Sequence, residues 1–341
     1  MTRNGARGAT ATEMDTALRF PPLAELNRGL NALTQLLGTR SGTEKVADTK
    51  GEIWLDLANQ VFGERSITWL EPFLTVLAEF YGTGMARADF VGDPQGERRV
   101  INQWVTDVTH DKIVDLIPAD LITPMTRMVL VNAVYLKAPW ATPFADPVPG
   151  EFSTPSGRQP ADMMTAVFSG RASTGQGWQA VEIVYLGGQL AMTVILPDPG
   201  AGDAVRAGLP DGLITDVLSS LEPGRSITLT MPTYSFRTRA ALRELLESLG
   251  MRRAFVGADF SGMTGQAELV VADVVHQGWI AVDQHGTEAA AATAVVMREV
   301  SAPAPDRVLT LVLDRPFWFV IHDVPTAAPL LVGRVTDPTA G

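Results

Sequence analysis

The chain of 341 residues contains no cysteine, which excludes a disulfide-stapled scaffold, thiol catalysis and cysteine-based metal sites. Charged residues are also few, at 19%, whereas 46% of residues are hydrophobic, so the chain can bury a sizeable core. Its 31 glycines and 23 prolines follow no period. Collagen-like repeats and extensive disorder are therefore excluded.

Positive charge is scarce as well, since 27 Lys and Arg residues face 38 Asp and Glu residues and leave a net charge of -11. A nucleic acid or an anionic membrane would need a basic patch, so we expect neither as a partner. The apolar runs, such as Met128 to Leu136, are shorter than the roughly 18 residues of a membrane-spanning helix. The first twenty residues lack the apolar region of a signal peptide, and the cysteine-free chain fits either side of a membrane, the extracellular side included.

Hydrophobic periodicity predicts a mixture of helices and strands. Apolar residues recur at helical spacing in four segments, at about Thr12 to Phe20, Ile67 to Tyr81, Arg98 to Thr109 and Arg239 to Leu249. Strands are expected at Ile53 to Phe62, Met128 to Leu136, Ala180 to Tyr185, Leu190 to Leu196, Ser226 to Met231, Val274 to Val282, Arg307 to Leu313, Phe317 to His322 and Leu330 to Thr336. Helices followed by many strands without regular alternation indicate one α+β domain over residues 1–341.

The common motifs of enzymes are missing. The sequence has no GxGxxG, P-loop, HExxH or GxSxG. The four histidines are scattered without ligand spacing, and a lone histidine is more often structural than catalytic. We therefore assign no catalytic residue and expect no metal and no cofactor.

Residues 286–297, GTEAAAATAVVM, are compatible with two structures. Alanine and glutamate favour a helix in isolation. The polar, proline-bearing stretch that follows indicates instead a long loop before the next strand, and loops of roughly twenty residues are uncommon unless they are functional. In a sheet, Thr287, Ala289, Ala291 and Thr293 would face the core, and no proline interrupts the backbone before Pro303.

Several segments, in order along nearly the whole chain, resemble the serpin family in its prokaryotic form. The similar segments are Ile101-Asn-Gln-Trp-Val105, Asn132-Ala-Val-Tyr-Leu-Lys-Ala-Pro-Trp140, Ala258-Asp-Phe-Ser-Gly262, Ala272-Asp-Val-Val-His276, Gly286-Thr-Glu-Ala-Ala-Ala-Ala-Thr293, Leu313-Asp-Arg-Pro-Phe317 and Leu331-Val-Gly-Arg-Val-Thr-Asp-Pro338. Each match alone is weak, but all of them in family order are specific.

The resemblance implies a monomeric serpin-like fold with three β-sheets, eight or nine helices and an exposed reactive loop. It implies an inhibitor, not an enzyme, whose cleaved loop inserts into the main sheet and traps a serine protease covalently. The hinge of that loop comprises Gly286, Thr287, Glu288, Ala289, Ala290, Ala291, Ala292 and Thr293. By the family's spacing the reactive bond is Val300-Ser301, which suits a chymotrypsin- or elastase-like protease. Arg298 is the rival residue and would suit a trypsin-like one.

The same resemblance assigns roles to three further residues. Asn132 and His276 match the family's shutter pair, whose hydrogen bond restrains opening of the main sheet. Trp140 matches the tryptophan at the breach, where the loop first enters. Family members have a helix, a strand and most of a second helix before the segment like Asn4-Gly-Ala-Arg-Gly8, and Gln284 stands where they usually have glutamate. A non-inhibitory or a truncated, inactive binding protein is therefore the alternative.

Overall fold

The structure is a computed structural model, and it describes residues 1–46, 49–266, 269–271, 274–288 and 308–340. The chain divides into two compact units. Unit 1 comprises Met1–Thr39, Asp56–Tyr135 and Arg237–Trp279, and unit 2 comprises Arg40–Leu55, Leu136–Phe236 and Ile280–Gly341. The single domain expected over residues 1–341 stays a prediction.

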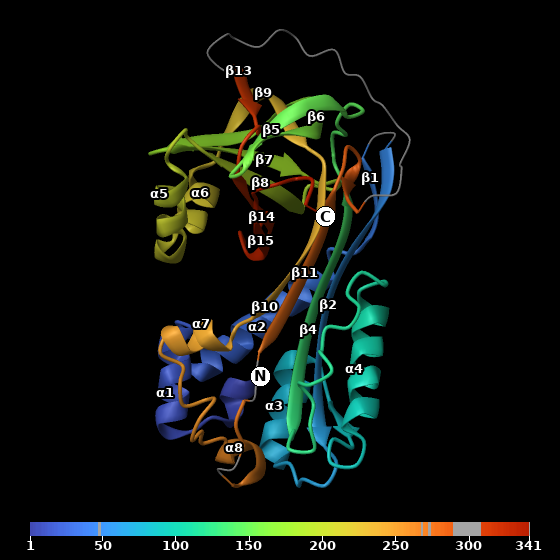
Figure 1. The fold of residues 1–341 in the computed structure, drawn as a ribbon, viewed down its shortest axis with the longest axis vertical. Coiled ribbons are helices and arrows are strands. Elements are labelled where there is room, and N and C mark those ends of the chain that lie inside the picture. Colours follow the sequence, from blue (N-terminus) through green and yellow to red (C-terminus); the bar gives the residue numbers. More distant parts are fainter. Residues whose placement is uncertain (47–48, 267–268, 272–273, 289–307, 341) are drawn as a thin grey trace. The chain divides into compact units, whose positions relative to one another are not determined.

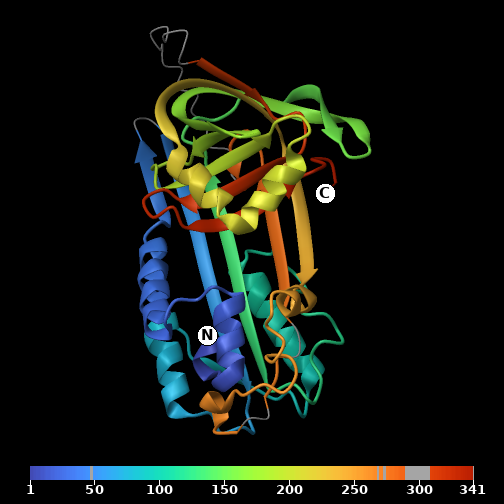
Figure 2. The same cartoon turned by 90° about the vertical axis from the view of Figure 1, so that its left-hand side faces the viewer.

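Helices dominate unit 1. They are η1 (Thr2–Gly5), α1 (Gly8–Ala17), α2 (Leu23–Gly38), α3 (Glu71–Tyr81), α4 (Pro94–Val108), α7 (Arg243–Ser248) and α8 (Ser261–Thr264). α4 begins where the Asp93 carboxylate accepts a hydrogen bond from the backbone N–H of Gly96. α3 ends at Gly82, whose φ of 60° places it in the left-handed region that suits glycine. Figure 2 shows α2 lying beside α3.

Two helices differ from the sequence-based expectation. The helix expected over residues 239–249 is shorter, because residues up to Ala241 belong to strand β10 (Tyr234–Ala241) and only α7 remains helical. α2 was not expected, although its leucines at positions 26, 30, 33 and 37 follow a helical stripe after Pro22. Among the described residues, no helix is long and apolar enough to cross a membrane.

Unit 1 has two apolar clusters. One joins α1, α3 and the segment near α8 through residues that include Met14, Phe73, Leu77 and Phe260. The other buries Ile101 and Val105 of α4 with neighbouring side chains of the same unit. Most of the apolar stripe expected on residues 98–109 therefore forms the buried face of α4, but Val100 lies outside it and is 55% exposed.

The first sheet has seven strands. They are β1 (Gly42–Val46), β2 (Thr49–Glu64), β3 (Met85–Ala88), β4 (Met128–Pro139), β10, β11 (Val275–Val282) and β12 (Gly286–Thr287). Their order is β1-β2-β4-β12-β11-β10, and β3 pairs with β2. In the described part of the chain, β4 and β11 are thus neighbours of the two-residue strand β12 and not of each other.

The second sheet lies in unit 2 and has eight strands (Figure 1). They are β5 (Val148–Thr154), β6 (Gly157–Gly175), β7 (Trp178–Val184), β8 (Leu190–Pro197), β9 (Glu222–Pro232), β13 (Val308–Val312), β14 (Phe317–Asp323) and β15 (Pro329–Val335). Their order is β13-β9-β6-β7-β8-β14-β15, with β5 paired to β6. Helices α5 (Gly202–Gly208) and α6 (Leu213–Ser220), joined by η2 (Leu209–Asp211), pack apolar side chains against it.

The expected mixed α+β fold is confirmed, with eight α-helices in the described ranges. The resemblance implied three sheets, and the described strands form two. The reason is the length of β6, since its residues 163–170 pair with β9 and its residues 172–175 pair with β7. One long strand therefore joins what would otherwise be two smaller sheets.

Candidate functional site

A tight turn in unit 2 separates β11 from β12. The Asp283 carboxylate oxygen Oδ1 accepts hydrogen bonds from the backbone N–H groups of His285, at 2.7 Å, and Gly286, at 3.1 Å. The backbone N–H of Asp283 in turn donates to the carbonyl of Gly286 at 3.0 Å. Aspartate often stabilises turns in this way, by accepting hydrogen bonds from backbone N–H groups two or three residues further along the chain. The turn reverses the chain so that residues 286–287 run back along β11.

Strand β12 consists of the first two residues of the predicted hinge. Thr287 pairs with Val282 of β11 and with Ala138 of β4, and Gly286 pairs with Pro139. All three pairings are antiparallel. The first two residues of the predicted hinge therefore form a short strand between β4 and β11, which agrees with the strand alternative for these two residues.

Thr287 is 2% exposed and its side chain points into an aromatic cluster. The hydroxyl groups of Thr287 and Tyr185 are 2.6 Å apart, and both are buried. The ring of Tyr185 stacks on that of Trp140 with a centroid distance of 4.5 Å and an interplanar angle of 10°. Burial raises the pKa of Tyr185, so its phenol stays neutral and can donate this hydrogen bond.

Trp140, the predicted breach residue, also forms hydrogen bonds with the turn between β11 and β12. Its indole Nε1 donates to the carbonyl of Asp283 at 2.9 Å, and its backbone N–H donates to the carbonyl of His285 at 2.8 Å. The backbone N–H of Phe144 donates to the carbonyl of Gln284 at 2.9 Å. Trp140 itself is fully buried. The carbonyl groups of all the turn residues, 283–285, thus accept hydrogen bonds from the segment that follows β4.

Glu288 is the residue where β12 stops. Its φ is 49°, a left-handed value that residues other than glycine rarely adopt. Its backbone N–H still donates to the carbonyl of Ala281 in β11 at 3.0 Å. The chain therefore keeps one bond to β11 at Glu288 while its backbone turns out of the strand conformation.

The predicted shutter residues lie in unit 1, on two different strands. Asn132 of β4 and His276 of β11 are both exposed. The side-chain amide of Asn132 donates to the amide oxygen of Asn59 in β2 at 2.9 Å. Among the hydrogen bonds of the described residues, none joins Asn132 to His276. Their predicted pairing stays a prediction.

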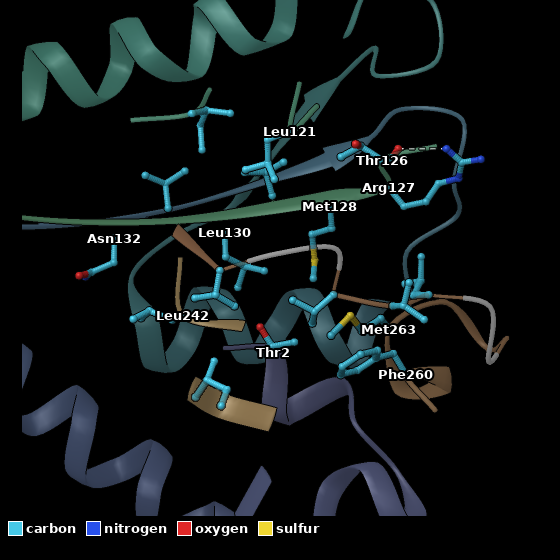
Figure 3. A pocket seen from close by; sticks show the side chains of 18 of the residues that line it. Thr2, Leu121, Thr126, Arg127, Met128, Leu130, Asn132, Leu242, Phe260 and Met263 are labelled. Atoms are coloured by element: carbon cyan, nitrogen blue, oxygen red, sulfur yellow. Dashed lines mark hydrogen bonds between the residues drawn. The ribbon is translucent and has the colours of Figure 1, made fainter. Parts of the chain in front are cut away.

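A cavity of about 410 Å³ lies in unit 1 beside the first half of β4. Figure 3 shows Met128 and Leu130 of β4 on one side of it and Met263 and Leu242 on the other. Asn132 lies at one end of this lining. The lining is mainly apolar, and a cavity of this volume could hold several side chains.

Unit 2 also buries a small polar cluster on the face covered by α6. His322 Nε2 lies 2.9 Å from the Thr193 hydroxyl and 3.7 Å from Glu182 Oε2, and Glu182 pairs with Arg171 at 3.1 Å. Burial lowers the pKa of His322, the Asp323 backbone and charge raise it, and the Arg171 charge lowers it further. His322 and Glu182 are each only 2% exposed, whereas Arg171 at the edge of the cluster is 36% exposed.

Part of the predicted site lies outside the described residues. It comprises the remaining hinge residues Ala289, Ala290, Ala291, Ala292 and Thr293, the reactive bond Val300-Ser301 and its rival Arg298. Within the described residues, the structure brings Gly286 and Thr287 together with Trp140. Tyr185, which sequence reasoning missed, completes this group; its only signal was its place at the end of an expected strand, just before Gly187-Gly188.

Comparison with known proteins gives one consistent result. A family model described as serpin (serine protease inhibitor) matches residues 1–338. An uncharacterized serpin-like protein of Thermococcus kodakarensis is 33% identical, over 100% of this chain and 78% of its own length. The leukocyte elastase inhibitor of Bos taurus is 30% identical, over 98% and 88%. The crystal structure of the thermophilic serpin tengpin in its native state matches with a TM-score of 0.84 at 26% identity, over 98% of this chain and 84% of that one.

Proposed function

Since this chain belongs to the family described as serpins (serine protease inhibitors), we propose that it is an inhibitor and not an enzyme, and that it traps its target by inserting the cleaved loop between β4 and β11. The observation that carries the proposal is β12. The first two hinge residues already occupy a strand position between β4 and β11. Insertion would lengthen this strand and would need no new pairing partner.

The register of β12 fixes where each further loop residue would lie along β4. Thr287 pairs with Ala138, so the two residue numbers add to 425. An antiparallel ladder keeps this sum constant. Thr293 would then lie opposite Asn132, because 293 and 132 also add to 425. The first residue of β4, at position 128, would be reached by residue 297.

The register along β11 leads to the same place. Thr287 pairs with Val282, so these numbers add to 569, and 293 and 276 add to the same value. Thr293 would therefore lie between Asn132 and His276. This supports the assignment of both as shutter residues, since a loop that passes this level must separate them. Because side chains alternate along a strand, Thr293 would share the inward face of Thr287.

The free energy of insertion is large enough to drive the trap. Ten residues, 288–297, would gain ladder partners, and a net hydrogen bond is worth roughly 0.5–1.5 kcal/mol, so the total is on the order of ten kcal/mol. Residues that now line the cavity beside β4 would also gain contacts. The uncleaved state would then be held by a kinetic barrier and not by its own free energy.

In the chemical step, all catalytic groups belong to the protease. Its serine oxygen attacks the carbonyl carbon of Val300, and the amine of Ser301 leaves after taking a proton from the protease histidine. The ester between the serine and Val300 remains until water hydrolyses it. Loop insertion would remove the protease from that geometry before hydrolysis. An apolar side chain at position 300 fits the hydrophobic primary pocket of chymotrypsin or the small one of elastase.

The experiment is incubation with chymotrypsin, elastase and trypsin, followed by a denaturing gel and mapping of the cleavage site. We expect a band at the summed masses of the 36.6 kDa chain and the protease for the first two, with cleavage at Val300-Ser301. Val300→Asp should abolish that band, whereas Arg298→Ala should leave it. Cleavage without a covalent band for any protease would contradict the proposal and favour a non-inhibitory or inactive binding protein.

A further inference from the structure

Three neighbouring strands of unit 2 carry an uncharged outer face. In register across β6, β9 and β13, three rows of three residues point to the same side of the sheet. We call this face the platform, and its residues are Thr165, Val167, Ser169, Ser226, Thr228, Thr230, Val308, Thr310 and Val312. The alternate residues on the other side, such as Ile227, Leu229 and Leu311, are buried in the core.

The platform combines exposed valines with hydroxyl side chains and carries no charge. Charged residues make up 19% of the chain, yet none occurs among these nine positions. Val167 is 62% exposed, Val308 is 48% exposed and Val312 is 42% exposed. The hydroxyls of Thr165 and Thr230 lie 2.9 Å apart and so partly satisfy each other. Such a face loses little on leaving water, because it has no charge to desolvate.

The edge of the platform lies close in sequence to the proposed reactive bond. β13 is the outermost strand in the strand order and pairs with β9 (Figure 1). It begins at Val308, eight residues after Val300. Eight residues span at most roughly 29 Å even when fully extended. A protease domain of about 230 residues has a radius of gyration of about 17 Å, so a protease holding Val300 is confined to the neighbourhood of β13.

We propose that the platform is a docking surface for the target serine protease, an inference that rests on the proposed function and extends it. The residues from Ser301 to Val308 follow the cleaved bond, so the platform meets the rim of the protease cleft on the leaving-group side. An uncharged platform would match an uncharged rim on the protease. The contact adds to recognition of position 300 and raises the rate at which the loop is attacked.

The test measures the second-order rate at which intact chain disappears with elastase, whether it ends as covalent complex or as cleaved product. Thr228→Glu places a charge at the centre of the platform, and Thr310→Lys places the opposite charge at its exposed edge. Thr43→Glu, on exposed strand β1, is the matched control. We expect each platform variant to react at least tenfold more slowly than the control variant. A synthetic peptide of residues 293–307 should be cleaved more slowly than the wild-type chain.

Three results would overturn the docking surface. Rates for both variants within twofold of Thr43→Glu would exclude the contact, and opposite effects of Glu and Lys would indicate charge steering instead. A change confined to the oligomeric state would assign the platform to a second copy of the chain. Because the measured quantity includes simple cleavage, the platform can be tested even if no covalent complex forms. Thermal unfolding within a few degrees of wild type verifies that the variants are folded.

Discussion

The two halves of β4 are packed differently. In the second half, Tyr135, Leu136 and Ala138 are buried, and the strand ends against β12 and the stacked ring of Trp140. In the first half, Val131 and Ala133 are buried, but residues 128–130 are only partly buried, Asn132 is exposed, and an apolar cavity of about 410 Å³ lies alongside. A strand normally buries its apolar run along its whole length. The half without β12 beside it is therefore the half that would gain most from another strand.

The largest effect is expected from blocking that additional strand. Thr293→Arg would place a charge at the inward position opposite Asn132, where it cannot be buried without a partner. We expect the covalent complex to be lost almost completely. The stabilisation on cleavage, on the order of ten kcal/mol and roughly 20 °C in Tm, should disappear with it. A denaturing gel and thermal unfolding of the cleaved chain measure the two quantities.

Ala290→Arg is the matched control, because position 290 would face away from the core in the same strand. It should keep most of the covalent complex. Equal loss in both variants would mean that the insertion register derived from β12 is wrong.

The next largest effect should come from Trp140, against which the second half of β4 ends. Trp140→Ala removes a fully buried side chain that stacks on Tyr185 and bonds to Asp283, so we expect it to lower the free energy of unfolding by about 3–5 kcal/mol. Trp54→Ala is the comparison, because Trp54 is 36% exposed, and it should cost clearly less. Urea denaturation measures both. Similar costs would mean that the stacked, fully buried Trp140 stabilises the fold no more than a partly exposed tryptophan does.

A smaller effect should follow from the buried hydroxyl pair of Tyr185 and Thr287. Tyr185→Phe leaves the Thr287 hydroxyl buried without a partner, so we expect a loss of about 1–3 kcal/mol. Adding Thr287→Val should cost little more, because the pair is then absent altogether. Since burial raises the pKa of Tyr185, the double-mutant cycle should give the same coupling at pH 7 and pH 9. Strictly additive costs would contradict a direct bond.

The smallest expected effect is a gain in stability on filling the cavity beside the first half of β4. Leu130 points into the cavity (Figure 3), so Leu130→Phe has room for its ring and should raise the free energy of unfolding by about 0.5–1 kcal/mol. Leu190→Phe, in the closely packed β8, should instead destabilise by about 1–3 kcal/mol. Chemical denaturation of the two variants compares them directly. Destabilisation of both would indicate that the cavity cannot accept a larger side chain.

The sequence was informative wherever one pattern dominated. Strands such as β8 and β14 appear close to their expected ranges, because uninterrupted apolar runs permit few alternatives. The segment 239–249 shows the limit. Its leucines predicted a helix throughout, but the backbone up to Ala241 pairs in the sheet, and such long-range pairing leaves no mark in local periodicity.

The residues of the candidate site were likewise predictable only where they belonged to a recognisable sequence pattern. Gly286, Thr287 and Trp140 could be assigned from a family resemblance, and the structure brings them together. Tyr185 could not, because its contact with Thr287 joins residues 102 positions apart in the chain. The partly buried start of β4 was also unexpected, since an apolar run does not reveal whether a neighbouring strand is present.

The backbone conformation of Glu288 ends β12, and it also affects how soon that strand can begin to grow after cleavage. Its φ of 49° must become extended before residue 288 can join β12. A left-handed residue that is not glycine costs roughly 1–2 kcal/mol, so this change of backbone conformation would be downhill once the cleaved end is released. The interval between cleavage and strand growth, in which water competes for the ester, would then begin with a change in the backbone of one residue.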